Sequence, residues 1–165
     1  MKHKIILLLF MAVSFSAFSQ NGVTLYGFYQ ESLPGTIPKG TDENGNTIPK
    51  KSAVDYIIYL KAPASSKITP VEIWIKGEQT LLQAEKTKTP VHIQSSGTGN
   101  STTLVPKTGS NVWKIIPTSS TNYIKFTRAR DKAEVNDVVV VYKLKGKFYS
   151  ATLKNLKRLE PRNNE

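Results

Sequence analysis

The six residues Val71-Glu72-Ile73-Trp74-Ile75-Lys76 alternate aliphatic side chains with side chains that carry a charge or an indole N–H. A period of two is typical of a β-strand, in which successive side chains point to opposite faces of the sheet. The three aliphatic residues would then face a core, and Glu72, Trp74 and Lys76 would face solvent. This stretch therefore predicts β structure with one buried face and one wet face.

Similar β-prone stretches lie on both sides of it. Val138-Val139-Val140-Val141-Tyr142 is a short run rich in β-branched residues, which indicates a buried strand. The turn signal Lys145-Gly146 follows, so this strand and residues 147–153 predict a terminal hairpin. Further strands are expected at residues 23–29, 55–60, 80–87, 91–94, 112–116 and 123–127, with a short helix as the alternative around Leu81-Leu82.

About eight or nine short strands at this spacing predict an all-β protein. No amphipathic pattern is long enough for a substantial helix, and Arg128 to Asp137 is expected to be a charged link. A small antiparallel β-sandwich, immunoglobulin-like or similar, is preferred over a closed barrel because sandwiches are more frequent. We expect one domain over residues 21–160, followed by a frayed basic tail at residues 161–165.

The first twenty residues, MKHKIILLLFMAVSFSAFSQ, predict a cleaved signal peptide. Lys2, His3 and Lys4 precede an apolar run from Ile5 to Val13, which is far shorter than the roughly 20 residues of a membrane-spanning helix. Cleavage is expected after Ser19 or Gln20. The segment resembles the leaders of exported proteins of Gram-negative bacteria, particularly those that end in a serine-glutamine pair, and this resemblance implies a periplasmic or secreted protein.

The 165-residue chain contains no cysteine. Disulfides, thiol catalysis, cysteine-ligated metals and a lipid-anchored cysteine are therefore excluded, and the fold depends on packing alone. No later apolar run reaches membrane-spanning length, so the mature protein is not expected to span a membrane.

The chain is strongly basic, with a formal net charge of +11. Lys2 and Lys4 contribute two of these charges, which leaves +9 on the predicted mature chain. Such an excess favours encounters with anionic partners such as an acidic protein face, a glycan or lipid headgroups. Nucleic acid is not an expected partner, because an exported protein rarely meets it.

Two groups of residues are candidates for a binding surface. A loop from Ser32 to Ser52 repeats the tetrapeptide Thr-Ile-Pro-Lys around Asn44-Gly45, which predicts two arms of a protruding ribbon that presents Asn44, Lys50 and Lys51. The second group combines two tryptophans expected on polar strand faces with the basic terminal hairpin, and its members are Trp74, Trp113, Lys143, Lys145 and Lys147.

Catalytic and metal sites receive little support from the sequence. After cleavage of the leader, His92 is the one remaining imidazole, and its alternating surroundings point it to solvent. We therefore expect no metal, no cofactor and no catalytic residue. The preferred hypothesis is a non-catalytic binding module of the bacterial envelope that binds a protein partner. The alternatives are a module for glycans or anionic lipids and, third, a small hydrolase with paired carboxylates drawn from Glu72, Glu78, Asp55 and Asp137.

Overall fold

The computed structural model describes residues 22–33, 53–94, 99–118 and 127–163, and the fold below refers to these residues. The predicted leader, the loop residues Asn44, Lys50 and Lys51, and most of the strand expected at 123–127 lie outside them. The elements are β1 (Thr24–Leu33), β2 (Ala53–Ala62), β3 (Ile68–Ile75), β4 (Glu78–Lys86), β5 (Val91–Gln94), β6 (Ser101–Val105), β7 (Asn111–Thr118), α1 (Thr127–Ala133), β8 (Val138–Leu144), β9 (Lys147–Leu153), β10 (Lys157–Arg158) and β11 (Arg162–Asn163).

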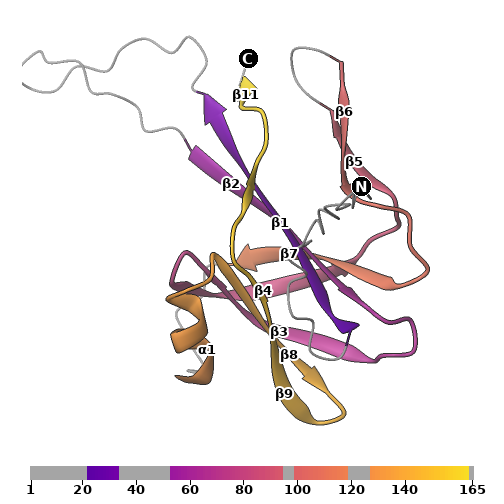
Figure 1. Ribbon diagram of the computed structural model, residues 1–165, viewed down its shortest axis with the longest axis vertical. Coiled ribbons are helices and arrows are strands. Elements are labelled where there is room, and N and C mark those ends of the chain that lie inside the picture. Colours follow the sequence, from indigo (N-terminus) through magenta and orange to yellow (C-terminus); the bar gives the residue numbers. More distant parts are fainter. Residues whose placement is uncertain (1–21, 34–52, 95–98, 119–126, 164–165) are drawn as a thin grey trace, which may run out of the picture.

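The strands form one large curled sheet and one separate hairpin (Figure 1). Eight strands follow the order β10-β1-β2-β7-β4-β3-β8-β9, β11 pairs with β1 beside this path, and β5 pairs with β6. All pairs are antiparallel except those of β10 and β11 with β1. The all-β prediction is confirmed. The predicted two-sheet sandwich and its immunoglobulin-like form are not, because the main strands share one continuous path of hydrogen bonds.

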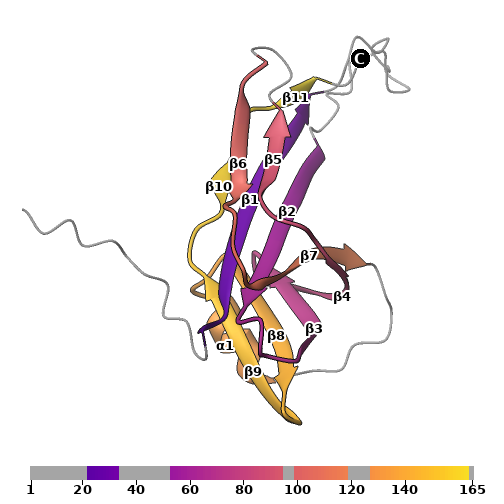
Figure 2. The same cartoon turned by 90° about the vertical axis from the view of Figure 1, so that its right-hand side faces the viewer.

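The curl brings the edge strand β9 back beside β1 (Figure 2). Gly27 of β1 lies so close to this edge that a Cβ atom there would be 2.5 Å from Leu153 Cδ2 and 2.8 Å from Leu156 Cδ2. Glycine is therefore the residue that permits the contact. The inner face of the sheet carries the main core, which includes the fully buried residues Ile58, Leu60, Ile73, Val138, Val140 and Tyr142.

The outer face of the sheet is covered in two places, which the sequence did not predict. The β5–β6 hairpin packs Leu104 and Val105 against Phe28, Tyr59 and Val112. At the other end, Ala129 and Ala133 of α1 pack against Val139, Val141 and the half-buried Trp74. The prediction of a wet face opposite the core is therefore wrong for these parts of the sheet, because polar sequence on a strand face does not reveal what a later segment places over it.

Three local predictions also require correction. The charged link expected from Arg128 to Asp137 holds all but the first residue of α1, whose two alanines lie four residues apart and so share one helix face. The short helix considered at Leu81-Leu82 is absent, since both residues belong to β4. Arg162 and Asn163, expected to fray, pair with Ser32 and Leu33 as β11.

Candidate functional site

The β8–β9 hairpin ends in a turn whose two central residues are Lys145 and Gly146. Their φ angles are 48° and 79°, the left-handed conformation that a two-residue hairpin turn of type I′ requires. The register pairs Lys143 with Phe148 and Leu144 with Lys147. This tight geometry holds three lysines at one end of a projecting ribbon.

The exposed side chains at this end form what we call the tip patch: Lys143, Lys145, Lys147 and Phe148. Phe148 is 50% exposed, and Lys143 Nζ lies 5.9 Å from its ring centroid. Lys145 belongs to the turn rather than to β8, and Lys147 has the strand parity opposite to that of Lys143. The three lysines therefore surround the tip instead of lining a single strand face.

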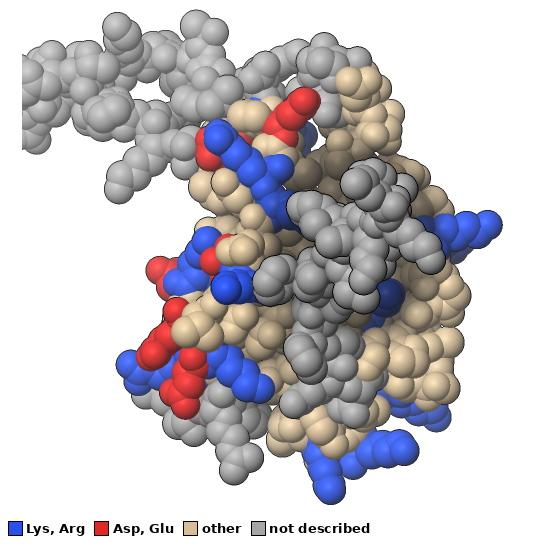
Figure 3. All heavy atoms as spheres, viewed as in Figure 1, with Lys and Arg blue, Asp and Glu red and all other residues tan. Residues whose placement is uncertain are grey.

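The electrostatic character of this end is uniformly positive along the hairpin. Residues 138–153 include three lysines and no acidic residue. Lys132 of α1 adds a fourth ammonium group nearby, since its Nζ donates to Ser150 Oγ at 2.6 Å. In the space-filling view, basic side chains extend from the end of the molecule where the hairpin lies, away from the acidic side chains of this face (Figure 3).

The two tryptophans proposed as exposed ligand platforms are not exposed in that way. Trp113 is 8% exposed and belongs to the main core, although it is out of phase with Val112, because both faces of β7 are covered at this point. Trp74 is half-buried against the cluster of α1 and β8. The structure therefore leaves the lysines of the predicted basic surface exposed but separates them from both indoles.

Glu72 is a buried carboxylate that sequence reasoning assigned to the wet face. It is 1% exposed, and its carboxylate accepts hydrogen bonds from Trp74 Nε1 and from the side chain of Gln79. Burial raises the pKa of Glu72 above its ordinary value of 4.5, although both hydrogen bonds act in the opposite direction. The sequence signal for this burial was the pair Ala129 and Ala133, which form a small apolar helix face in an otherwise charged segment.

Replacement of Glu72 by glutamine is expected to remove a pH dependence of stability. With a raised pKa, the folded state keeps its proton longer than the unfolded state, so the free energy of unfolding falls as pH rises from about 4.5 through the raised pKa. Glu72→Gln retains an acceptor for Trp74 but does not ionise. Urea unfolding at a series of pH values should show this decline in the wild type and a flatter profile in the variant.

The conservative variant Glu85→Gln supplies the control, because Glu85 is exposed on the neighbouring strand β4. Its pH profile should follow that of the wild type. Equal slopes for Glu72→Gln and the wild type above pH 4.5 would contradict the buried placement of Glu72.

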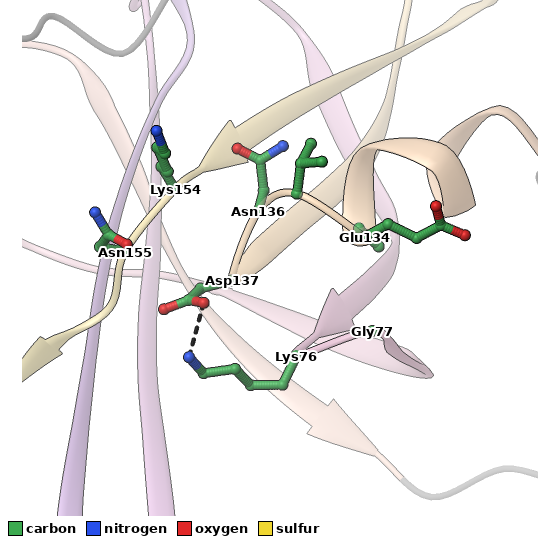
Figure 4. Close-up of a pocket in the computed structure, with 9 residues that line it drawn as sticks. Lys76, Gly77, Glu134, Asn136, Asp137, Lys154 and Asn155 are labelled. Atoms are coloured by element: carbon green, nitrogen blue, oxygen red, sulfur yellow. Dashed lines mark ion pairs between the residues drawn. The ribbon is translucent and has the colours of Figure 1, made fainter.

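A shallow hollow of about 410 Å³ lies beside the end of α1, and its lining includes Lys76, Asn136, Asp137, Lys154 and Asn155. Lys76 Nζ is 2.7 Å from Asp137 Oδ1, while the backbone N–H of Leu156 donates to Asp137 Oδ2 at 2.8 Å. Figure 4 shows the Lys76 and Asp137 side chains pointing toward one another. The Asp137 carboxylate thus links the β3–β4 turn to the segment after β9, which is a structural role.

These partners determine the ionisation of Asp137. Desolvation on its own would raise the pKa, but the hydrogen bonds from Lys76 and Leu156, together with the charge of Lys76, bring the pKa below its ordinary value of 3.8. The folded state therefore releases this proton more readily than the unfolded state. Its contribution to stability is present above pH 3.8 and is lost as pH falls through the lowered pKa.

Asp137→Asn is expected to lower the free energy of unfolding at pH 7 by about 1 kcal/mol, because an amide still accepts from Leu156 but leaves Lys76 without its counter-charge. The variant should also lose less stability than the wild type below pH 3.8. Thermal unfolding at pH 7 and pH 3 measures both effects. An unchanged melting temperature at pH 7, with identical acid sensitivity, would show that this tie is not formed in solution.

The remaining candidate residues are dispersed over the described parts of the chain. His92 is exposed, as predicted, and its Nδ1 lies 3.1 Å from Thr103 Oγ1. Asp55 accepts a hydrogen bond from Ser32 Oγ at 3.1 Å. No group of three or more histidine, cysteine or acidic side chains suited to a metal ion occurs among the described residues. None of the described helices has the length and apolar character to cross a bilayer.

Comparison with known proteins adds no further assignment. No protein-family model, no curated protein and no solved structure matches the chain.

Proposed function

We propose that this protein is an exported, non-catalytic binding module that recognises an acidic face of a protein partner in the bacterial envelope. The leader-like segment at residues 1–20 supports export. The tip patch supports the choice of partner, because it joins a positive field to an apolar contact on a rigid turn. We infer that the β8–β9 hairpin makes the first contact.

The observation that carries this proposal is the half-exposed Phe148 among the lysines of the tip. An exposed aromatic ring loses little side-chain entropy on binding and buries a large area, so it suits the centre of an interface. Lysines around it increase the rate of encounter with an acidic surface and lose this effect as salt is added.

The alternative partner is an anionic glycan or a lipid headgroup. Such a module would need the lysines but gains nothing from Trp74 and Trp113 in their observed places. The hydrolase alternative is weaker still: Glu72 is buried on the sheet face that α1 covers, and Asp137 is engaged by Lys76 and Leu156. Both carboxylates are thus accounted for by structural contacts.

Cross-linking followed by affinity purification from intact cells tests the proposal. The tagged wild type is compared with the triple variant Lys143→Ala, Lys145→Asn, Lys147→Ala, in which asparagine tolerates the left-handed turn position. A matched control removes the same charge from three exposed lysines elsewhere, namely Lys88→Ala, Lys107→Ala and Lys114→Ala. We expect one enriched acidic protein that is retained by the control and reduced at least fivefold by the tip variant.

Two outcomes would overturn the proposal. One is equal recovery with the tip variant and the control, which would mean that only net charge matters. The other is salt-sensitive binding of the purified protein to phosphatidylglycerol vesicles or acidic polysaccharide with no protein recovered from cells, which would favour the alternative partner.

A further inference from the structure

Strand β2 is longer than the part of it that pairs with β7. Ile58 to Ala62 pair with β7, whereas residues 53–57 pair with β1 alone among the described residues. In β7 the ladder to β2 ends at Ile115, and Pro117 follows two residues later. Proline has no N–H to donate, so the sequence of β7 explains why the pairing stops. Within the described part of the chain, one edge of β2 therefore has no strand partner over residues 53–57.

Two other edges of the main sheet are protected. Edge strand β9 begins with Lys147 and curls back beside β1. The outer edge of β1 is covered in parallel by β10 and β11 from the C-terminal part of the same chain. Lysine side chains and added strands are the usual protections against unwanted pairing. Residues 53–57, by contrast, contain neither lysine nor proline.

The side chains along this edge indicate which kind of strand could pair with it. Ala53, Val54 and Asp55 are exposed, and Val54 retains 43% of its accessible surface. Val54 and Tyr56 share the face that continues into the main core, whereas Asp55 lies on the opposite face. An added strand would therefore gain from an apolar residue on the Val54 face and a basic residue opposite Asp55.

We propose that the edge of β2 at residues 53–57 binds an extended segment of a partner protein by β-strand addition, with a lysine or arginine of that segment opposite Asp55. Backbone hydrogen bonds supply the affinity in this mode, and alternating side chains supply the selectivity. A second copy of this chain is a poorer occupant, because antiparallel self-pairing centred on Asp55 would place two carboxylates opposite one another. This contact does not depend on the tip patch, which lies at the other end of the molecule (Figure 1).

Hydrogen–deuterium exchange with a synthetic probe tests the proposal. The probe is the capped heptapeptide Lys-Val-Thr-Val-Lys-Val-Thr, and its matched control carries glutamate in place of both lysines. We expect the lysine peptide to slow amide exchange within residues 53–57 and to bind at least tenfold more tightly than the glutamate peptide. Asp55→Lys should reverse this preference, and Val54→Pro should abolish protection of the edge.

Val54→Pro could disturb the pairing of β1 with β2 as well as the free edge. Asp55→Lys provides an independent test, since Asp55 is an exposed residue whose replacement leaves the backbone intact. The inference is overturned if the lysine peptide protects no amide in residues 53–57, or protects β9 instead. It is equally overturned if Asp55→Lys leaves the peptide preference unchanged. Sedimentation that shows a dimer with protection of this edge in the absence of peptide would assign the edge to a second copy and also reject it.

Discussion

Trp113→Ala is expected to lower the free energy of unfolding by about 3–5 kcal/mol, the usual cost of removing a large aromatic side chain from a core. Trp113 is 8% exposed and lies in the main core beside Leu60, its partner on β2. The remaining cavity would lie in the middle of the sheet, where neighbouring strands restrict relaxation. Urea unfolding followed by far-ultraviolet circular dichroism measures the loss.

The matched control for this substitution is Phe148→Ala, which removes an aromatic ring from an exposed site. Phe148 keeps half of its surface in solvent, so its loss should cost no more than about 1 kcal/mol. Similar losses for the two variants would contradict the burial of Trp113 and would restore the interpretation that it is a surface residue.

Gly27→Val is expected to destabilise the protein by about 1–3 kcal/mol through overpacking. The new side chain would occupy the space of Leu153 and Leu156, which approach Gly27 where the curled sheet returns to β1. Leu156 is buried and has little room to move. Because the contact joins the two ends of the sheet, we also expect faster amide exchange in β9 than in β4. Denaturant unfolding and hydrogen exchange report the two effects.

Gly109→Ala is the control for Gly27→Val, since no atom lies within 4 Å of a Cβ built at Gly109. Its stability should differ from that of the wild type by less than about 0.5 kcal/mol. A Gly27→Val protein as stable as this control would mean that β9 does not close against β1 in solution.

The sequence predicts individual strands well because alternation and β-branched runs are local signals. Val138 to Tyr142 and the turn at Lys145-Gly146 appear as predicted. The arrangement of the strands is less accessible, because the closure at Gly27 depends on residues more than 120 positions away. A glycine inside a strand indicates that another segment approaches the backbone closely, but it does not indicate which segment.

The candidate site shows the same division. The exposure of the tip lysines could be predicted because it depends only on a local feature, their positions around a hairpin turn. Trp74 packs instead against the cluster that α1 forms with β8, and Glu72 is on the same sheet face. Because α1 lies more than fifty residues later and is mostly charged, its sequence was interpreted as a link. Strand periodicity assigns these residues to the correct face but does not tell whether that face is covered.

Photo-cross-linking in intact cells is the sharpest test of whether the hairpin tip binds a protein partner. A photoreactive phenylalanine analogue replaces Phe148 in one strain and the exposed Gln83 of β4 in another. We expect a discrete cross-linked protein from position 148 that disappears when Lys143 and Lys147 are changed to glutamate, and no such product from position 83. Absence of a product at position 148, or the same product from both positions, would contradict it.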